Sequence, residues 1–250
     1  MIKSGFPGLQ IIQIDELAST NNYASSLLAT NNAAEGTVIL TFRQTSGRGY
    51  GKNVWESENY KNLTFSLILM PRWLEASRQF LISQVVSLGV ADFLRSKTRG
   101  VTIKWPNDLL IYNKKVAGIL IENTILGSHV QTSVVGIGLN INQAIFPDYL
   151  PVATSLALIT GREYQLEKSL NIIITEIFKW YGYLKLNNIR MIEEEYLKNL
   201  FRMEEKTLFR TGDTLFEAKI KGIDQYGQLL LEENPGRIKA WPFKSIDMVF

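Results

Sequence analysis

Residues 103–123 read IKWPNDLLIYNKKVAGILIEN, in which short apolar runs alternate with charged and amide side chains. Apolar pieces of this length, bounded by turn-forming residues, predict successive β-strands. The polar positions fall where those strands begin and end, and they are Lys104, Asn107, Asp108, Lys114 and Lys115. Lysines at both mouths of a hairpin favour a site that holds two anions together while one attacks the other.

The residues alone leave two interpretations of this stretch open. Pro106 restrains Trp105 to an extended conformation and ends a strand, so the polar side chains around it converge at one end of a sheet. Alternatively, the segment is a strand-turn-strand corner with solvated charges, and Lys115 protects an edge strand from aggregation. Gly118 stands among strand formers, which indicates that another group approaches the backbone closely there.

Apolar periodicity along the rest of the chain predicts further strands and helices. The expected strands are 11–14, 36–42, 63–70, 101–105, 108–112, 115–123 and 130–140, and the expected helices lie within 17–29, 75–97, 166–186 and 191–201. Ser19 or Thr20 is expected to cap the first helix. After about Met203 the pattern changes to short alternating strands, which predicts a small antiparallel barrel. We therefore expect one domain at 1–203 and a second at 204–250.

Two glycine-rich stretches are candidates for contact with a ligand. In the long loop 43–62, residues 47–52 read GRGYGK, where glycines let the backbone approach an anion and Arg48 offers a bidentate fork. A mobile surface loop is the alternative explanation. Residues 136–140 read GIGLN, and two glycines in a strand indicate either a β-bulge or the close approach of another group.

Composition excludes several kinds of chemistry. The net charge is +3, from 27 basic and 24 acidic residues, which is too small to argue for a nucleic-acid partner. The absence of cysteine excludes disulfides and cysteine-ligated zinc. The single histidine, His129, lies in LGSHVQ, which predicts a surface turn entering a strand, and one histidine cannot form a histidine cluster for a metal. A Ser-His-Asp triad is therefore disfavoured.

Targeting signals are also missing from the sequence. Residues 1–7 lack the apolar core of a secretory signal, and no apolar run reaches the roughly 18 residues that a membrane helix needs. We therefore expect a cytoplasmic protein with no membrane partner.

Six motifs follow one another along the chain. They are Ser19-Thr20-Asn21, Gln44 with Gly47-Arg48-Gly49, Trp55, Lys104-Trp105-Pro106-Asn107-Asp108, Lys115-Val116-Ala117-Gly118-Ile119-Leu120 and Gly136-Ile137-Gly138-Leu139-Asn140. In this order they resemble the biotin protein ligases, also called biotin–[acetyl-CoA-carboxylase] ligases. The terminal KGIDQYGQLLLE and IKAWPF are similar to the small Src-homology-3-like barrel of that family, so the resemblance covers nearly the whole chain.

The resemblance implies an α+β fold in which helices flank a central mixed β-sheet, with a small C-terminal SH3-like β-barrel. This catalytic fold is common to biotin and lipoate ligases and is like that of class II aminoacyl-tRNA synthetases. The implied reaction has two steps. Biotin and Mg²⁺-ATP give biotinyl-5′-AMP and pyrophosphate, and the acyl group then passes to a lysine of an apo biotin carboxyl carrier protein.

The resemblance also implies roles for individual residues. The biotin-binding residues would be Ser19, Thr20, Asn21, Gln44, Arg48, Gly49, Tyr50, Lys115 and Gly118. The residues that bind ATP and the adenylate would be Arg48, Trp55, Lys104, Asn107, Asp108, Lys115 and Asn140, with Trp55 on adenine, Asn140 at its edge and Asp108 near the ribose or Mg²⁺. Arg48, Lys104 and Lys115 are the expected catalytic groups, because a carboxylate must approach a polyanionic triphosphate.

Two features depart from the family pattern. Only 18 residues precede Ser19, so we expect no helix-turn-helix and no nucleic-acid partner. Many members carry a second basic residue where this chain has Tyr50, so we expect the loop to close differently over the adenylate. The alternatives are a lipoate or octanoate ligase or transferase, and a non-catalytic biotin-binding regulator. Monomer and homodimer are both compatible with the family.

Overall fold

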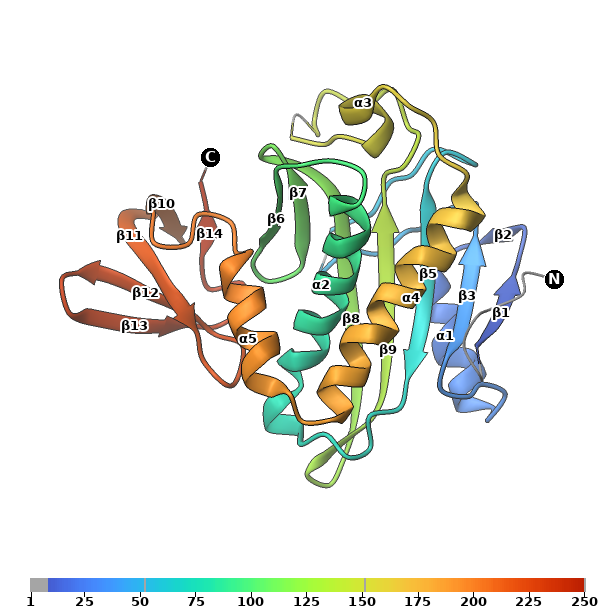
Figure 1. The fold of residues 1–250 in the computed structure, drawn as a ribbon, viewed down its shortest axis with the longest axis horizontal. Helices are drawn as coiled ribbons and strands as arrows, with labels where there is room; N and C mark the ends of the chain where they lie inside the picture. Colours follow the sequence, from blue (N-terminus) through green and yellow to red (C-terminus); the bar gives the residue numbers. More distant parts are fainter. Residues whose placement is uncertain (1–8, 52, 151, 250) are drawn as a thin grey trace.

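A seven-stranded sheet forms the centre of the molecule in the computed structural model, which describes residues 9–51, 53–150 and 152–249. The strands are β1 (Gln10–Gln13), β3 (Thr37–Thr41), β5 (Leu63–Leu69), β6 (Val101–Lys104), β7 (Asp108–Ile111), β8 (Lys114–Leu126) and β9 (His129–Leu139). Their order across the sheet is β1-β3-β5-β9-β8-β7-β6 (Figure 1). β1 runs parallel to β3 and the other neighbours are antiparallel, which confirms the mixed sheet.

Helices lie on both faces of this sheet. α2 (Phe80–Arg95) and α4 (Leu166–Lys185) cross one face, and α1 (Thr20–Ala29) lies behind the other (Figure 1). Because side chains alternate along a strand, Leu67 of β5 joins the main core whereas its neighbour Ile68 packs in a second cluster with Ala24 of α1. The helices in the described ranges include none that is both long and apolar enough to cross a membrane.

Short polar residues mark where two of the helices begin. Ser19 caps α1, because its hydroxyl accepts a hydrogen bond from the Asn22 amide at 3.5 Å. A short helix that periodicity did not predict, α3 (Leu156–Thr160), starts in the same way at Ser155 and ends at Gly161, where φ is +68°. Ser155 and Gly161 are cap signals that the sequence carries, but five helical residues are too few for a periodic pattern.

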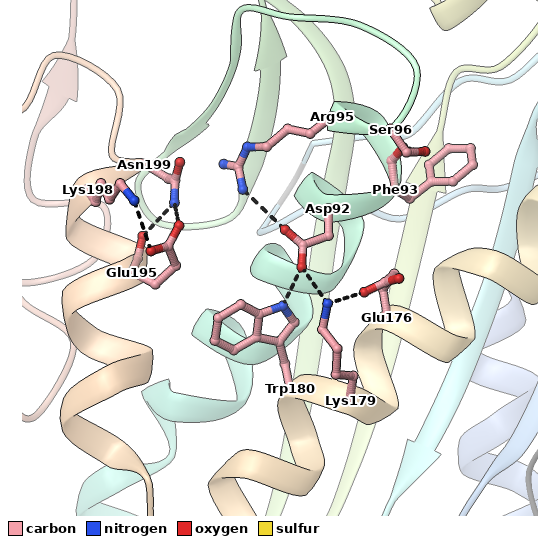
Figure 2. A network of polar contacts seen from close by, with 10 residues as sticks. All are labelled: Asp92, Phe93, Arg95, Ser96, Glu176, Lys179, Trp180, Glu195, Lys198 and Asn199. Atoms are coloured by element: carbon pink, nitrogen blue, oxygen red, sulfur yellow. Dashed lines mark hydrogen bonds and ion pairs between the residues drawn. The ribbon is translucent and has the colours of Figure 1, made fainter.

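A network of polar contacts links α2 to α4 on the face of the sheet opposite α1 (Figure 2). The Asp92 carboxylate of α2 accepts hydrogen bonds from Trp180 Nε1 at 2.8 Å and Lys179 Nζ at 3.0 Å, both on α4. Lys179 also pairs with Glu176 one turn earlier. Beside it, α5 (Ile189–Lys198) carries Glu195, which accepts a hydrogen bond from Asn199 at 2.8 Å.

A second sheet follows α5. Its strands are β10 (Lys206–Thr211), β11 (Thr214–Ile223), β12 (Leu229–Asn234), β13 (Arg237–Trp241) and β14 (Asp247–Met248), in the antiparallel order β13-β12-β11-β10-β14. It docks on the KWPND segment, where Trp105 stacks on Phe243 at 5.3 Å between ring centroids and donates its indole N–H to the Gly227 carbonyl at 2.9 Å. One hydrophobic core therefore runs from the large sheet into the small one.

Candidate active site

Three glycines make room for other side chains on the α1 face of the sheet. Gly118 of β8 lies directly opposite Gly138 of β9, and an added Cβ at Gly138 would lie 2.2 Å from Cε2 of Trp55. At Gly136 a Cβ would lie 2.3 Å from Oδ1 of Asn21. The register between β8 and β9 shifts only at Thr124, away from these glycines, so the β-bulge interpretation is wrong and close approach is confirmed.

A buried polar cluster lies at one end of this glycine floor. The Thr20 amide donates to Gln44 Oε1 at 3.0 Å, and the Ser66 hydroxyl lies 2.7 Å from Thr20 Oγ1 and 2.6 Å from Asn21 Oδ1. Asn21 is only 3% exposed and donates from Nδ2 to the Leu120 carbonyl at 3.3 Å. Helix α1 thus presents its first residues to the cavity in fixed orientations, because each amide and hydroxyl already has a partner.

The glycine-arginine loop folds back on itself above the floor. The Trp55 amide donates to the Gly47 carbonyl at 3.0 Å, and the Gly49 amide donates to the Asn53 carbonyl at 2.8 Å. Arg48 projects from this turn and pairs with Glu122 at 2.8 Å. The described part of the loop therefore forms a hydrogen-bonded turn over the site.

Tyr50 on the same loop contacts the small sheet. The Lys244 ammonium stands 3.9 Å from the centre of the Tyr50 ring, a distance at which a cation is attracted to an aromatic face. Lys52, the basic residue two positions later, lies outside the described residues.

The two lysines of the KWPND-to-KVAGIL stretch flank one carboxylate. Lys115 Nζ lies 2.7 Å from Asp108 Oδ1, and Lys104 of β6 stands opposite Asp108 of β7 in the antiparallel register. Burial lowers the pKa of Lys104, the Asp108 carboxylate opposes this effect, and the Lys115 charge adds to it. The two lysine charges are therefore close enough to affect each other.

The predicted residues line two adjoining cavities. The first is lined by Ser19, Thr20, Asn21, Gln44, Arg48, Gly49, Tyr50, Trp55, Asn107, Asp108, Lys115 and Gly118, together with other residues. Asn140 lines the second. Val54, Trp55 and Lys115 line both cavities, so these residues form the wall between them. Lys104 is among the lining residues of neither, and the charge of Asp247 in the small sheet raises its pKa, as the charge of Asp108 does.

Two polar atoms at this wall have no partner within the described residues. They are Nε1 of Trp55 and Oδ1 of Asn140, and both are buried. Asn140 is oriented by its own Nδ2, which donates to the Thr154 carbonyl at 3.0 Å. Because buried polar atoms in folded proteins nearly always form hydrogen bonds, a donor and an acceptor at this position fit a ligand with both kinds of group.

Sequence reasoning missed three residues that organise the site. Ser66 bridges Thr20 and Asn21, Asn22 accepts a hydrogen bond from Arg48 at 2.7 Å, and Glu122 pairs with Arg48. Asn22 directly follows the predicted Ser-Thr-Asn motif, which was a usable signal. Ser66 and Glu122 stand in strands with no distinguishing neighbour, and their partners are distant in the sequence.

Comparisons with known proteins agree on one family. The model of the Biotin/lipoate A/B protein ligase family matches residues 14–140. The bifunctional ligase/repressor BirA of Bacillus subtilis is 36% identical, over 96% of this chain and 74% of its own length. The biotin–[acetyl-CoA-carboxylase] ligase of Paracoccus denitrificans is 29% identical, over 88% of this chain and 95% of its own.

A solved structure supports the same assignment. The biotin protein ligase from Aquifex aeolicus in complex with biotin and ATP is 25% identical, with a TM-score of 0.81 over 96% of this chain and 98% of that one. This likeness confirms the predicted ligase fold. With the six motifs gathered around one pair of cavities, the chain belongs to the biotin/lipoate A/B protein ligase family.

Proposed function

We propose that this protein is an ATP-dependent biotin–[acetyl-CoA-carboxylase] ligase. In the first step a carboxylate oxygen of biotin attacks the α-phosphorus of ATP, and pyrophosphate leaves. In the second step the amine of a carrier lysine attacks the acyl carbon of biotinyl-5′-AMP, and AMP leaves. The observation that carries this proposal is the position of Arg48 and Lys115 on one cavity that also holds the polar cluster of α1.

Electrostatics is the main difficulty of the first step. A carboxylate is already a nucleophile and needs no general base, but it must approach a triphosphate of the same sign. Cationic groups fixed in advance at the reacting centre lower this barrier, because they need not reorganise as charge moves. Lys115 stands at the wall between the two cavities, where an acid in one would meet a nucleotide in the other. Arg48 would bind the same two anions, the biotin carboxylate and the triphosphate.

The two cavities take different parts of the adenylate in this proposal. Thr20, Asn21 and Gln44 would bind the ureido ring of biotin, because their amide and hydroxyl groups offer both donors and acceptors. Trp55 would lie against adenine, and the free Oδ1 of Asn140 would accept from its amino group. Asn107, whose Nδ2 donates to the Ile119 carbonyl at 2.5 Å, would shape the floor near the phosphates.

Lys104 has an indirect role in this scheme. It does not line either cavity, yet it lies beside the Asp108–Lys115 pair. Its positive charge would act through the field that it adds to the phosphate site.

Magnesium would arrive with ATP. The described residues contain no group of three acidic, histidine or cysteine side chains that could hold a metal. A magnesium ion commonly keeps its waters and binds one or two carboxylates plus substrate phosphates, and Asp108 fits such a single contact. The ion would neutralise part of the phosphate charge.

A lipoate or octanoate ligase is the nearest rival within the family. The dithiolane ring of lipoate and the chain of octanoate have no amide to match the cluster of Thr20, Asn21 and Gln44. A pocket built to form hydrogen bonds discriminates strongly against a ligand that lacks them. The polar cluster therefore favours biotin. A non-catalytic regulator would have no use for Lys115 at the wall between the two cavities.

The test combines both steps in purified components. Protein, ATP, Mg²⁺ and labelled biotin are incubated with an apo carrier domain, and the control carrier has arginine at the acceptor lysine. We expect label in the first carrier only, and biotin-dependent exchange of pyrophosphate into ATP. Exchange with lipoate or octanoate in place of biotin would support the rival. Binding of biotin without exchange or transfer would support the regulator. We propose the cytoplasm as the compartment, because the reaction consumes ATP.

A further inference from the structure

One carboxylate outside the cavities joins two parts of the site. Glu122 Oε2 accepts a hydrogen bond from Asn21 Nδ2 at 2.8 Å, and Glu122 Oε1 accepts one from Arg48 Nη2 at 2.8 Å. Arg48 Nη1 lies 3.4 Å from the other oxygen and donates to Asn22 Oδ1 at 2.7 Å. Helix α1 and the glycine-arginine loop are therefore tied to the same side chain of β8.

The sheet fixes where this carboxylate stands. Glu122 is two residues beyond Leu120 and four beyond Gly118, so all three project from the same face of β8. Gly118 and Leu120 line the first cavity, whereas Glu122 is not among its lining residues. Glu122 thus lies next to the cavity and reaches it only through Asn21 and Arg48.

The two partners of Glu122 differ in exposure and in how firmly they are held. Asn21 is nearly fully buried and is held by Ser66 and by the Leu120 carbonyl. Arg48 sits in a loop, and 44% of its side chain is exposed. A paired, planar guanidinium has fewer orientations than a free one. The buried Asn21 therefore helps to orient the more exposed Arg48 through Glu122.

We infer that Glu122 is a positioning residue for adenylate formation, which holds Arg48 in register with the biotin pocket through Asn21. This inference rests on the proposed function, because Arg48 is assigned there to the reacting anions. An exposed ion pair contributes little to stability, so the role of Glu122 is expected in the kinetics rather than in the folding free energy.

The substitution Glu122→Gln tests this directly. An amide keeps the shape of the side chain, but its single oxygen cannot accept from Asn21 and from both arginine nitrogens. We expect the kcat of biotin-dependent pyrophosphate exchange to fall by roughly tenfold to a hundredfold, the scale of a 1 Å misplacement. The KM for biotin should change much less, because Asn21 keeps its other two partners.

A matched control separates this role from a general loss of an ion pair. Glu16 pairs with Arg43 at 2.7 Å, with side-chain exposures of 49% and 40% against 35% and 44% for Glu122 and Arg48. Glu16→Gln removes an arginine–glutamate pair of the same kind, outside both cavities, and should leave exchange unchanged.

A double substitution identifies the route of the effect. If Glu122 acts through Arg48, the variant with both Glu122→Gln and Arg48→Ala should be no slower than Arg48→Ala alone. Additive losses would overturn the inference, as would a Glu122→Gln variant with the kcat of Glu16→Gln. A wild-type protein without any exchange would instead overturn the proposed function. If Glu122→Gln does not fold, Glu122→Asp keeps the charge but withdraws it by one methylene, and we expect the same loss of kcat.

Discussion

The substitution Lys115→Ala is the most direct test of the electrostatic argument for the first step. The Lys115 side chain is 35% exposed, and its ammonium pairs with Asp108 at 2.7 Å and lies 5.8 Å from the centre of the Trp55 ring. The backbone of Lys115 is held independently, because its amide donates to the Val152 carbonyl at 2.6 Å and its carbonyl accepts from the Thr154 amide at 2.9 Å. Truncation of the side chain therefore removes the charge and leaves the strand in place.

The expected effects on rate and on stability differ in size. Removal of one donor aimed at developing charge costs about 3 kcal/mol, which is roughly a 160-fold fall in kcat. Loss of a partly exposed ion pair costs about 1 kcal/mol of unfolding free energy, and this lowers Tm by about 2–4 °C in a chain of this size. Lys104 remains beside Asp108, which limits the cost of leaving that carboxylate without Lys115.

The assay is biotin-dependent exchange of labelled pyrophosphate into ATP, with thermal unfolding followed in parallel. Lys114→Ala is the control, because Lys114 is exposed, adjacent in the chain and absent from both cavities. We expect Lys114→Ala to match wild type. Exchange by Lys115→Ala within about twofold of Lys114→Ala would refute the reasoning and leave Lys115 with no role beyond its ion pair with Asp108.

Three further predictions follow from other parts of the site. Gly138→Ala places a methyl group 2.2 Å from Trp55, so tryptophan fluorescence should change and binding of a non-hydrolysable ATP analogue should weaken. Gly182→Ala is the control, because its methyl group meets nothing within 4 Å, and equal behaviour of the two variants would contradict this prediction. Tyr50→Arg should slow release of pre-formed biotinyl-adenylate by roughly tenfold to 150-fold, which corresponds to one charge-assisted hydrogen bond, whereas Tyr50→Phe should not slow it. Release from the arginine variant that is as fast as from wild type, or faster, would disprove this prediction. Burial lowers the pKa of Lys104, so its charge is present below that pKa and is lost as the pH rises through it. Pyrophosphate exchange should therefore decline at a lower alkaline pH in wild type than in Lys104→Arg. Coincident pH profiles of the two proteins would count against a role for Lys104.

Local chemistry made part of this site predictable. The mainly apolar stretch 63–70 predicted a strand, and every residue of Leu63–Leu69 is buried. Ser19 was a candidate cap because a short polar oxygen in front of a helix satisfies an amide that has no partner within the helix. Gly118 and Gly138 were recognisable because a strand gains nothing from glycine unless another group comes close.

Other features depend on contacts between distant parts of the chain, which a single sequence does not encode in any local pattern. That Trp55 lies on Gly138 follows from the way the loop folds back, and no property of either residue indicates the other. From the sequence, Glu122 resembles any exposed residue of a strand. Its role becomes visible only in the structure, where Arg48 and Asn21 contact it. Lys104 was expected at the site but lines neither cavity, and the small sheet brings the charge of Asp247 near it.

The stacking of Trp105 on Phe243 also affects when the site can form during synthesis of this protein. Phe243 is 138 positions after Trp105, so at roughly 5–20 residues per second the ribosome makes the second ring roughly 7–28 seconds after the first. During that interval Trp105 has no stacking partner, and the Gly227 carbonyl is made only in its last part. Because Lys104 and Asp108 flank this indole, the proposed phosphate site takes its final form late, and a nascent chain should acquire ligase activity only after Phe243 has been made.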